Sequence, residues 1–129
     1  MRTIKFRGQD EDGKWLYGDL RQRMGYWPAI IEGYCTDEGK VGYREIAVKE
    51  DTVGQFTGLK DKNGHDIYEG DILKAGSEKA KIEVRFVRGV FAFLWNGDLD
   101  DEFPCNAPTQ EWAEIVGNIH DNPKMIKRR

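Results

Sequence analysis

Two carboxylates in the segment "YEGDIL", Glu69 and Asp71, have a spacing that acid–base chemistry could use. Residues two apart on a regular strand point to the same face of a sheet. Two like charges on one face raise the pKa of one carboxyl group, which could then act as a general acid. However, the chain holds 23 acidic residues, so such pairs are frequent and most are simply hydrated. The pair is kept as a minor enzymatic hypothesis, and no catalytic residue is predicted.

Metal ligands are the next groups that could do chemistry. An acidic run contains Asp98, Asp100, Asp101 and Glu102. Oxygen ligands of this kind suit calcium or magnesium, but the run lacks the full spacing of a calcium loop. We therefore expect a hydrated acidic loop.

Cysteine and histidine are too few and too scattered for a structural zinc site, which needs about four ligands at close spacing. The chain has two of each, at Cys35, Cys105, His65 and His120. We predict no metal and expect reduced thiols of the kind found in cytosolic proteins. The sequence also lacks the Gly-x-Ser-x-Gly, Gly-Lys-Ser/Thr and His-Glu-x-x-His motifs. The prediction is a protein that is not an enzyme and has no cofactor.

The elements that would position any site are short strands. Apolar and polar residues alternate in runs such as "TIKFRG" and "KIEVRF", which is typical of half-buried strands. Asp12-Gly13 and Asn63-Gly64 are hairpin turn signals, because these residues tolerate positive φ. Strands and turns recur roughly every 8–12 residues, which favours a mainly β barrel or roll with little helix.

One segment could be helix or strand. Thr109 could cap a helix that has Trp112, Ile115, Val116 and Ile119 on one face. We favour a strand for "EIVGNI", because isoleucine and valine are β-formers and Gly117-Asn118 would disrupt a helix.

Two segments echo one another, "FRGQDEDGKWLYGDL" from Phe6 and "FTGLKDKNGHDIYEGDIL" from Phe56. The echo is either a duplicated binding element or, as we favour, two hairpins that need the same turn chemistry. In both, the chain is expected to bend at Gly-Asp, with the carboxylate accepting a backbone N–H. The residues predicted to shape turns and bends are Gly8, Gly18, Asp19, Gly58, Asn63, Gly64, Gly70, Asp71 and Gly117.

Aromatic residues are the better functional lead, because tryptophan and tyrosine at a surface are favoured in protein interfaces. The predicted contact residues are Trp15, Tyr17, Tyr26, Trp27 and Tyr68. An alternative is nucleic-acid binding through a basic strand face, formed by Lys79, Lys81, Arg85 and Arg88. The net charge of −3 does not favour that alternative.

No run of about 20 apolar residues, which a bilayer-spanning helix needs, occurs in the sequence, and no apolar run follows Met1. We therefore expect a cytoplasmic protein without a membrane partner.

Three stretches together resemble the YopX family of phage and prophage proteins. They are "IKFRGQDEDGKWLYGDL", "DTVGQFTGLKDKNGHDIYEGDIL" and "EIVGNIHDNP". The resemblance spans nearly the whole chain, but residues 21–47 and 76–110 carry no recognised motif. It implies a mainly β protein whose second half forms a small Src-homology-3-like barrel or roll. We therefore expect a single domain, residues 1–129, with an N-terminal β-hairpin-rich lobe (1–50), the barrel or roll (51–122) and, from its lysines and arginines, a basic tail (123–129).

The resemblance also implies carriage on a phage or prophage in a bacterial cytoplasm, and it carries no established activity. The resulting hypothesis is a non-enzymatic interaction module. Its partner is a protein that is not yet identified or a second copy of the chain. An unpaired edge strand would favour the second copy.

Overall fold

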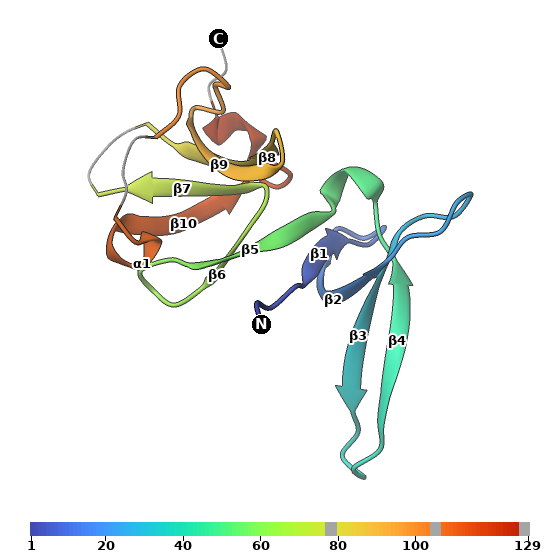
Figure 1. The fold of residues 1–129 in the computed structure, drawn as a ribbon. Coiled ribbons are helices and arrows are strands. Elements are labelled where there is room, and N and C mark those ends of the chain that lie inside the picture. Colours follow the sequence, from blue (N-terminus) through green and yellow to red (C-terminus); the bar gives the residue numbers. More distant parts are fainter. Residues whose placement is uncertain (77–79, 104–106, 127–129) are drawn as a thin grey trace. The chain divides into compact units, whose positions relative to one another are not determined.

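The computed structural model describes residues 1–76, 80–103 and 107–126 (Figure 1). Within these residues the strands are β1 (Phe6–Gln9), β2 (Trp15–Arg21), β3 (Ala29–Cys35), β4 (Val41–Ala47), β5 (Gly54–Lys60), β6 (Asp66–Tyr68), β7 (Asp71–Ala75), β8 (Ile82–Val87), β9 (Val90–Trp95) and β10 (Ala113–Asn118). The helical segments are η1 (Glu50–Thr52), α1 (Thr109–Trp112) and η2 (Pro123–Met125). The fold is mainly β, as the alternation of apolar and polar residues predicted.

The strands form two antiparallel sheets, with the orders β4-β3-β2-β1-β5-β6 and β10-β7-β8-β9. Residues 1–56 and residues 57–129 form two compact units. We call them the first unit and the second unit. The division falls inside β5, whereas the sequence placed the lobe boundary at residues 50 and 51.

The first unit is built from hairpins. The β1–β2 hairpin turns at Asp12-Gly13, as predicted, where Gly13 has φ +83° and the N–H of Asp10 bonds to the carbonyl of Lys14 at 3.0 Å. Strand β2 then changes partner, because its residues up to Gly18 pair with β1 and those from Asp19 onward pair with β3. Buried Leu16, Ile30 and Val48 form the core of this unit.

Strands β3 and β4 continue beyond that core as a two-stranded ribbon (Figure 1). Their register is unbroken from Ala29–Ala47 to Cys35–Val41. The end of the ribbon is exposed on both faces, since β3 is exposed from Gly33 onward and most of β4 is exposed.

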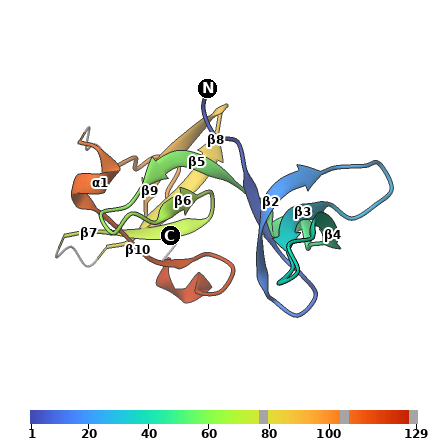
Figure 2. The ribbon, with the colours of Figure 1, turned by 90° about the horizontal axis from the view of Figure 1, so that it is seen from below.

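In the second unit, the chain turns at Asn63-Gly64, as the sequence predicted, and β6 lies beside the end of β5 (Figures 1 and 2). Buried Ile67, Leu73, Ile82, Val84 and Ala113 form its core. An aromatic cluster packs against them: the ring centroid of Phe103 lies 5.1 Å from that of Trp95 and 4.5 Å from that of Trp112. These two tryptophans are therefore structural.

The predicted barrel or roll is confirmed only as a mainly β fold of two antiparallel sheets, because the described residues form no closed barrel. The second sheet ends at β10 on one side and β9 on the other, and β6 belongs to the other sheet. The turn at Glu69-Gly70 interrupts the strand and sends β7 into the second sheet, which leaves both sheets open.

The segment that could be helix or strand contains a single helical turn followed by a strand. Ala113–Asn118 is β10, so the preference for a strand is confirmed over that range. The turn of α1 comes before it, with Pro108 at the cap position instead of Thr109. The hydroxyl of Thr109 donates to the carbonyl of Lys60 at 2.7 Å, so it ties α1 to the end of β5.

Candidate interaction surface

The Gly-Asp bend of the second unit is built as the sequence predicted. Gly70 has φ +95°, and the carboxylate of Asp71 accepts the N–H of Tyr68 at 2.7 Å. The carbonyl of Gly70 accepts the N–H of Ile119 at 2.9 Å, and Asn118 pairs with Asp71. Two segments of the motif, one central and one C-terminal, thus hold each other in shape.

The equivalent Gly18-Asp19 differs from that bend. Both residues lie within β2, and Asp19 is exposed. A side chain at Gly18 would place its Cβ 2.1 Å from the carbonyl oxygen of Ile31, so glycine permits close strand approach here. The echo marks a change of strand partner in both places, but the predicted Asp19 bend is wrong because β2 continues through it.

The other predicted shaping glycines have distinct roles. Gly8 lies against Val48, where a Cβ would come within 2.8 Å of a methyl group, and Gly117 is next to a β-bulge beside Asn122. Gly58 and Gly64 have positive φ, +87° and +81°, which glycine adopts with least strain.

Asp61 lies in the central motif stretch, but no role was predicted for its side chain. It is buried, and its carboxylate accepts the N–H groups of Asn63 and His65 at 2.9 Å and of Ile115 at 3.1 Å. Burial raises the pKa of Asp61, but the three N–H donors and the nearby His65 ring outweigh it and lower the pKa overall. The signal was an aspartate two residues before Asn-Gly, the pattern of an Asx turn.

Two of the carboxylates considered above as acid–base or metal-binding groups, Asp71 and Asp98, accept backbone N–H groups of their own turns. Asp71 is buried and holds the β6–β7 bend, and the turn at Glu69-Gly70 breaks the alternation that would have placed Glu69 on the same face. Asp98 accepts the N–H of Asp100 at 3.0 Å within its own loop. Among the described residues, no three acidic, histidine or cysteine side chains gather as a metal site.

The predicted aromatic residues divide into exposed and buried members. Tyr26 and Trp27 are 65% and 56% exposed, and Tyr17 is 49% exposed on β2. Trp15 is half-buried, with the Arg7 guanidinium 4.5 Å from its ring centroid. Tyr68 is only 4% exposed, so its ring has no surface to offer, and we leave it out of the candidate surface.

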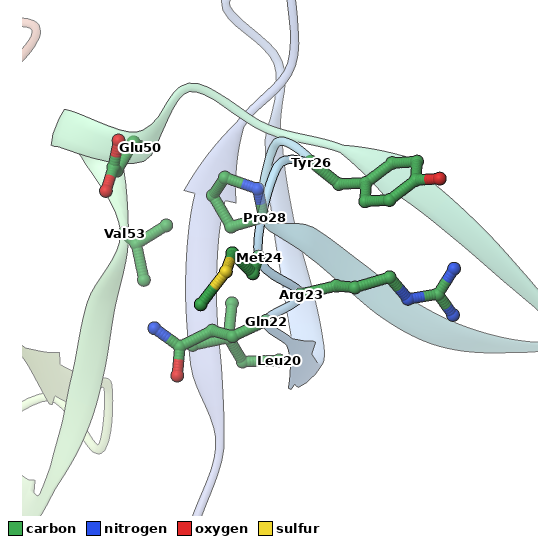
Figure 3. A pocket seen from close by; sticks show the side chains of 8 residues that line it. All are labelled: Leu20, Gln22, Arg23, Met24, Tyr26, Pro28, Glu50 and Val53. Atoms are coloured by element: carbon green, nitrogen blue, oxygen red, sulfur yellow. The ribbon is translucent and has the colours of Figure 1, made fainter.

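Two adjoining hollows in the first unit, which share Tyr26, Pro28 and Glu50, form what we call the Tyr26 groove. The first measures about 590 Å³ and is lined by Leu20, Gln22, Arg23, Met24, Tyr26, Pro28, Glu50 and Val53 (Figure 3). The second measures about 570 Å³ and is lined by Tyr26, Trp27, Pro28, Lys49, Glu50 and Asp51. In Figure 3 Tyr26 and Arg23 extend together along one side, and Glu50 and Val53 stand on the other.

The turn from β2 to β3 positions the aromatic side. The N–H of Tyr26 bonds to the carbonyl of Arg23 at 3.1 Å, and Gly25 has φ +81°. The guanidinium of Arg21 donates to the carbonyl of Trp27 at 3.2 Å. The turn is therefore held from two sides before any partner binds.

Helix η1 forms the opposite wall and is fixed to β1 through Thr52. The hydroxyl of Thr52 accepts the N–H of Gln9 at 2.9 Å and donates to the carbonyl of Lys49 at 2.6 Å. The N–H of Lys49 in turn bonds to the carbonyl of Gln9 at 2.8 Å. These bonds hold the exposed Glu50 and Asp51 at the groove.

The charged side chains at the groove differ in whether they contact another side chain. The guanidinium of Arg23 lies 5.3 Å from the ring centroid of Tyr26. Across the described ranges, the side chains of Glu50 and Asp51 form no ion pair with any residue. The groove therefore offers two uncompensated carboxylates beside an aromatic platform.

The basic strand face of the nucleic-acid alternative is less basic than the sequence implied. Lys79 lies outside the described residues, and Lys81 and Arg88 flank β8. Buried Glu83 interrupts the series and ion-pairs with Arg85 at 3.4 Å. The alternative stays a prediction, with its central arginine partly neutralised.

A family model described as YopX protein matches residues 5–127. The crystal structure of protein EF1440 from Enterococcus faecalis superposes with a TM-score of 0.59 and 22% identity, over 98% of this chain and 100% of that one. That likeness supports the fold alone. No curated protein matches the chain. In the described residues, no helix has the length and apolar character needed to cross a bilayer.

Proposed function

The chain belongs to the YopX protein family, and we propose that it is a non-enzymatic interaction module that binds an extended segment of a partner protein in the Tyr26 groove. The partner segment contains proline and carries an arginine or lysine. The single observation that carries the proposal is the placement of exposed Tyr26 and Trp27 opposite the unpaired carboxylates of Glu50 and Asp51.

Proline-rich segments favour this kind of surface for a physical reason. They adopt the polyproline II conformation before binding, so little entropy is lost, and they dock in grooves lined by aromatic rings. Tyr26, Trp27 and Pro28 supply such a lining, and the hydrogen bonds of the β2–β3 turn hold it in place. The carboxylates of Glu50 and Asp51 add charge complementarity to a basic side chain.

The setting is part of the same proposal. The module acts in the cytoplasm of a bacterium that carries a phage or prophage. The Src-homology-3-like class of the second unit stays a prediction, because its described strands form an open sheet.

The test is fluorescence polarisation with a set of short labelled proline-rich peptides, each containing one arginine, and a matched set with glutamate in its place. We expect the arginine peptides to bind more tightly. Tyr26→Ala with Trp27→Ala should weaken binding about 10- to 100-fold, the range expected for central aromatic contacts. The matched control is Tyr17→Ala, an exposed aromatic of the same unit that does not line the groove.

Charge and fold are checked separately. Glu50→Gln with Asp51→Asn should remove the preference for arginine over glutamate peptides and keep the aromatic contribution. Circular dichroism verifies that each variant is folded. Equal loss in the Tyr17→Ala control, or peptide binding that the paired alanines leave unchanged, would refute the assignment. Binding that follows added nucleic acid and weakens steeply with salt would favour the nucleic-acid alternative instead.

A further inference from the structure

The β3–β4 ribbon carries an open edge that the proposed groove does not use. In the described part of the chain, β4 hydrogen-bonds to β3 alone and ends the sheet order. Its register with β3 runs without a bulge, and β4 contains no proline. A bulge or a proline usually protects an edge strand from pairing with another chain, and β4 has neither. A two-stranded ribbon by itself is also only marginally stable in water.

The hydrogen-bond pattern identifies which backbone groups of β4 face outward. The N–H of Thr36 bonds to the carbonyl of Lys40 at 2.8 Å, and that of Val48 bonds to the carbonyl of Pro28 at 2.9 Å. Bonded pairs alternate in an antiparallel ladder, so the even-numbered residues of β4 bond to β3. The N–H and C=O groups of Val41, Tyr43 and Glu45 therefore point away from β3, toward the open edge.

The side chains of this edge are also available. Val41 and Tyr43 are each 80% exposed. On the other face, the ring of Tyr34 lies over Gly42, and the Arg44 guanidinium lies 5.1 Å from its centroid. Arg44 also pairs with Glu32 at 3.5 Å. The edge thus presents apolar, aromatic and charged groups with no covering strand.

Symmetry and charge restrict how a second β4 could pair with this edge. In an antiparallel pair, residues directly opposite each other have their side chains on the same face of the sheet. A two-fold axis between two neighbouring residues would set residues of opposite faces across from each other. The axis must therefore pass through a residue of β4, which then lies opposite its own copy. An axis at Arg44 sets arginine opposite arginine, and an axis at Glu45 sets glutamate opposite glutamate. Like charges directly opposite are destabilising. Axes nearer either end of β4 leave a much shorter overlap.

The axis at Tyr43 avoids these conflicts. It places Tyr43 opposite the partner's Tyr43, Val41 opposite the partner's Glu45, and Gly42 opposite the partner's Arg44. The outward backbone groups of Val41, Tyr43 and Glu45 then meet their counterparts in hydrogen-bonding register. Because Tyr34 lies over Gly42, the partner's Arg44 comes beside that ring, where a second cation–π contact can form.

We propose that the chain forms a homodimer by antiparallel pairing of β4 with β4 of a second copy, centred on Tyr43. The interface extends the sheet of the first unit across the two-fold axis. It is independent of the Tyr26 groove, which is built from other residues.

Disulfide trapping tests the register. Cysteines are introduced singly at positions 41, 43 and 45 in a background with Cys35→Ser and Cys105→Ser. In the proposed dimer only Tyr43→Cys faces its own copy, with Cα atoms about 5.5 Å apart, within disulfide range. The two copies of Val41→Cys are separated by roughly 13 Å along the strands, as are those of Glu45→Cys.

We expect mild oxidation to give a covalent dimer of Tyr43→Cys on a non-reducing gel and little dimer of either neighbour alone. A mixture of Val41→Cys and Glu45→Cys should cross-link to each other. Sedimentation equilibrium should show a dimer of the unmodified chain and a monomer of Tyr43→Lys, which places two lysines opposite each other. A monomeric unmodified chain, or cross-linking as strong at positions 41 and 45 alone as at 43, would overturn the proposal.

Discussion

Replacement of Asp61 should destabilise the second unit more than any exposed substitution near it. Its carboxylate accepts three backbone N–H groups, one of them 54 residues away at Ile115. A hydrogen bond to a charged acceptor contributes about 1.5–3 kcal/mol. The sum of three such bonds would exceed the loss of unfolding free energy that most single substitutions cause. However, Asn63 and His65 are exposed, and water can replace their acceptor after truncation.

We therefore expect Asp61→Ala to lower the free energy of unfolding by about 3–5 kcal/mol, since the Ile115 N–H is the hardest to satisfy again. Asp61→Asn retains one oxygen for the turn but presents an amide group to Ile115. Its expected cost is smaller, about 1–3 kcal/mol. The matched control is His65→Ala, because that side chain is largely exposed and should change stability by less than about 0.5 kcal/mol.

The assay is urea unfolding followed by tryptophan fluorescence. Trp15→Phe with Trp27→Phe removes the reporters of the first unit and leaves Trp95 and Trp112 to report on the second. The free energies of unfolding are then compared between the three substitutions and this parent. A loss for Asp61→Ala no larger than for His65→Ala would refute the inferred role of the carboxylate.

The dependence on pH provides a second test. The pKa of Asp61 is lowered in the folded chain, so its ionised form stabilises the fold at pH values above the ordinary aspartate pKa near 3.8. This contribution is lost as the pH falls through the folded-state pKa. The difference between the parent and Asp61→Asn should therefore be full at neutral pH and shrink below pH 3.8. A difference that persists unchanged at low pH would contradict the charge-based explanation.

Two further substitutions test the first unit. Gly18→Ala places a Cβ 2.1 Å from the carbonyl oxygen of Ile31, so we expect it to lower the free energy of unfolding by about 2–4 kcal/mol in urea. The control Glu11→Ala, an exposed substitution in the β1–β2 turn, should change it by less than about 0.5 kcal/mol. Thr52→Val removes both hydroxyl hydrogen bonds that fix η1, with an expected cost of about 1–3 kcal/mol and weaker peptide binding, whereas Thr52→Ser should restore both. Thermal unfolding and fluorescence polarisation of Thr52→Val and Thr52→Ser check this prediction. If Thr52→Ser lost as much stability and peptide binding as Thr52→Val, the role of the hydroxyl would be contradicted.

Local turn chemistry made much of the fold predictable. Asp12-Gly13 and Asn63-Gly64 turn as expected, because few residue pairs tolerate the required positive φ. The carboxylate of Asp71 accepts the N–H of Tyr68 in a hydrogen bond, as expected, because a short acidic side chain can reach the nearby backbone. Such features depend on a few neighbouring residues, and the sequence states those residues directly.

Long-range features were less predictable. The open second sheet follows from which strands pair after the Glu69-Gly70 turn, and alternation does not specify the partners. The burial of Tyr68 and the bond from Ile115 to Asp61 depend on the same packing. The Tyr26 groove was anticipated only in its aromatic residues, because its acidic wall comes from η1, which follows two strands later.

The motif stretches and most of the proposed contact residues lie in different parts of the chain. Within the motif stretches, Gly8, Asp61, Gly70 and Gly117 fix turns and close approaches. The aromatic side of the groove and the whole β4 edge lie within residues 21–47, which carry no recognised motif. A scaffold defined by backbone geometry leaves its surface side chains free to vary. We therefore infer that the motif stretches mainly specify the fold and supply Asp51 of the acidic wall, whereas residues 21–47 supply the aromatic contacts that determine the partner.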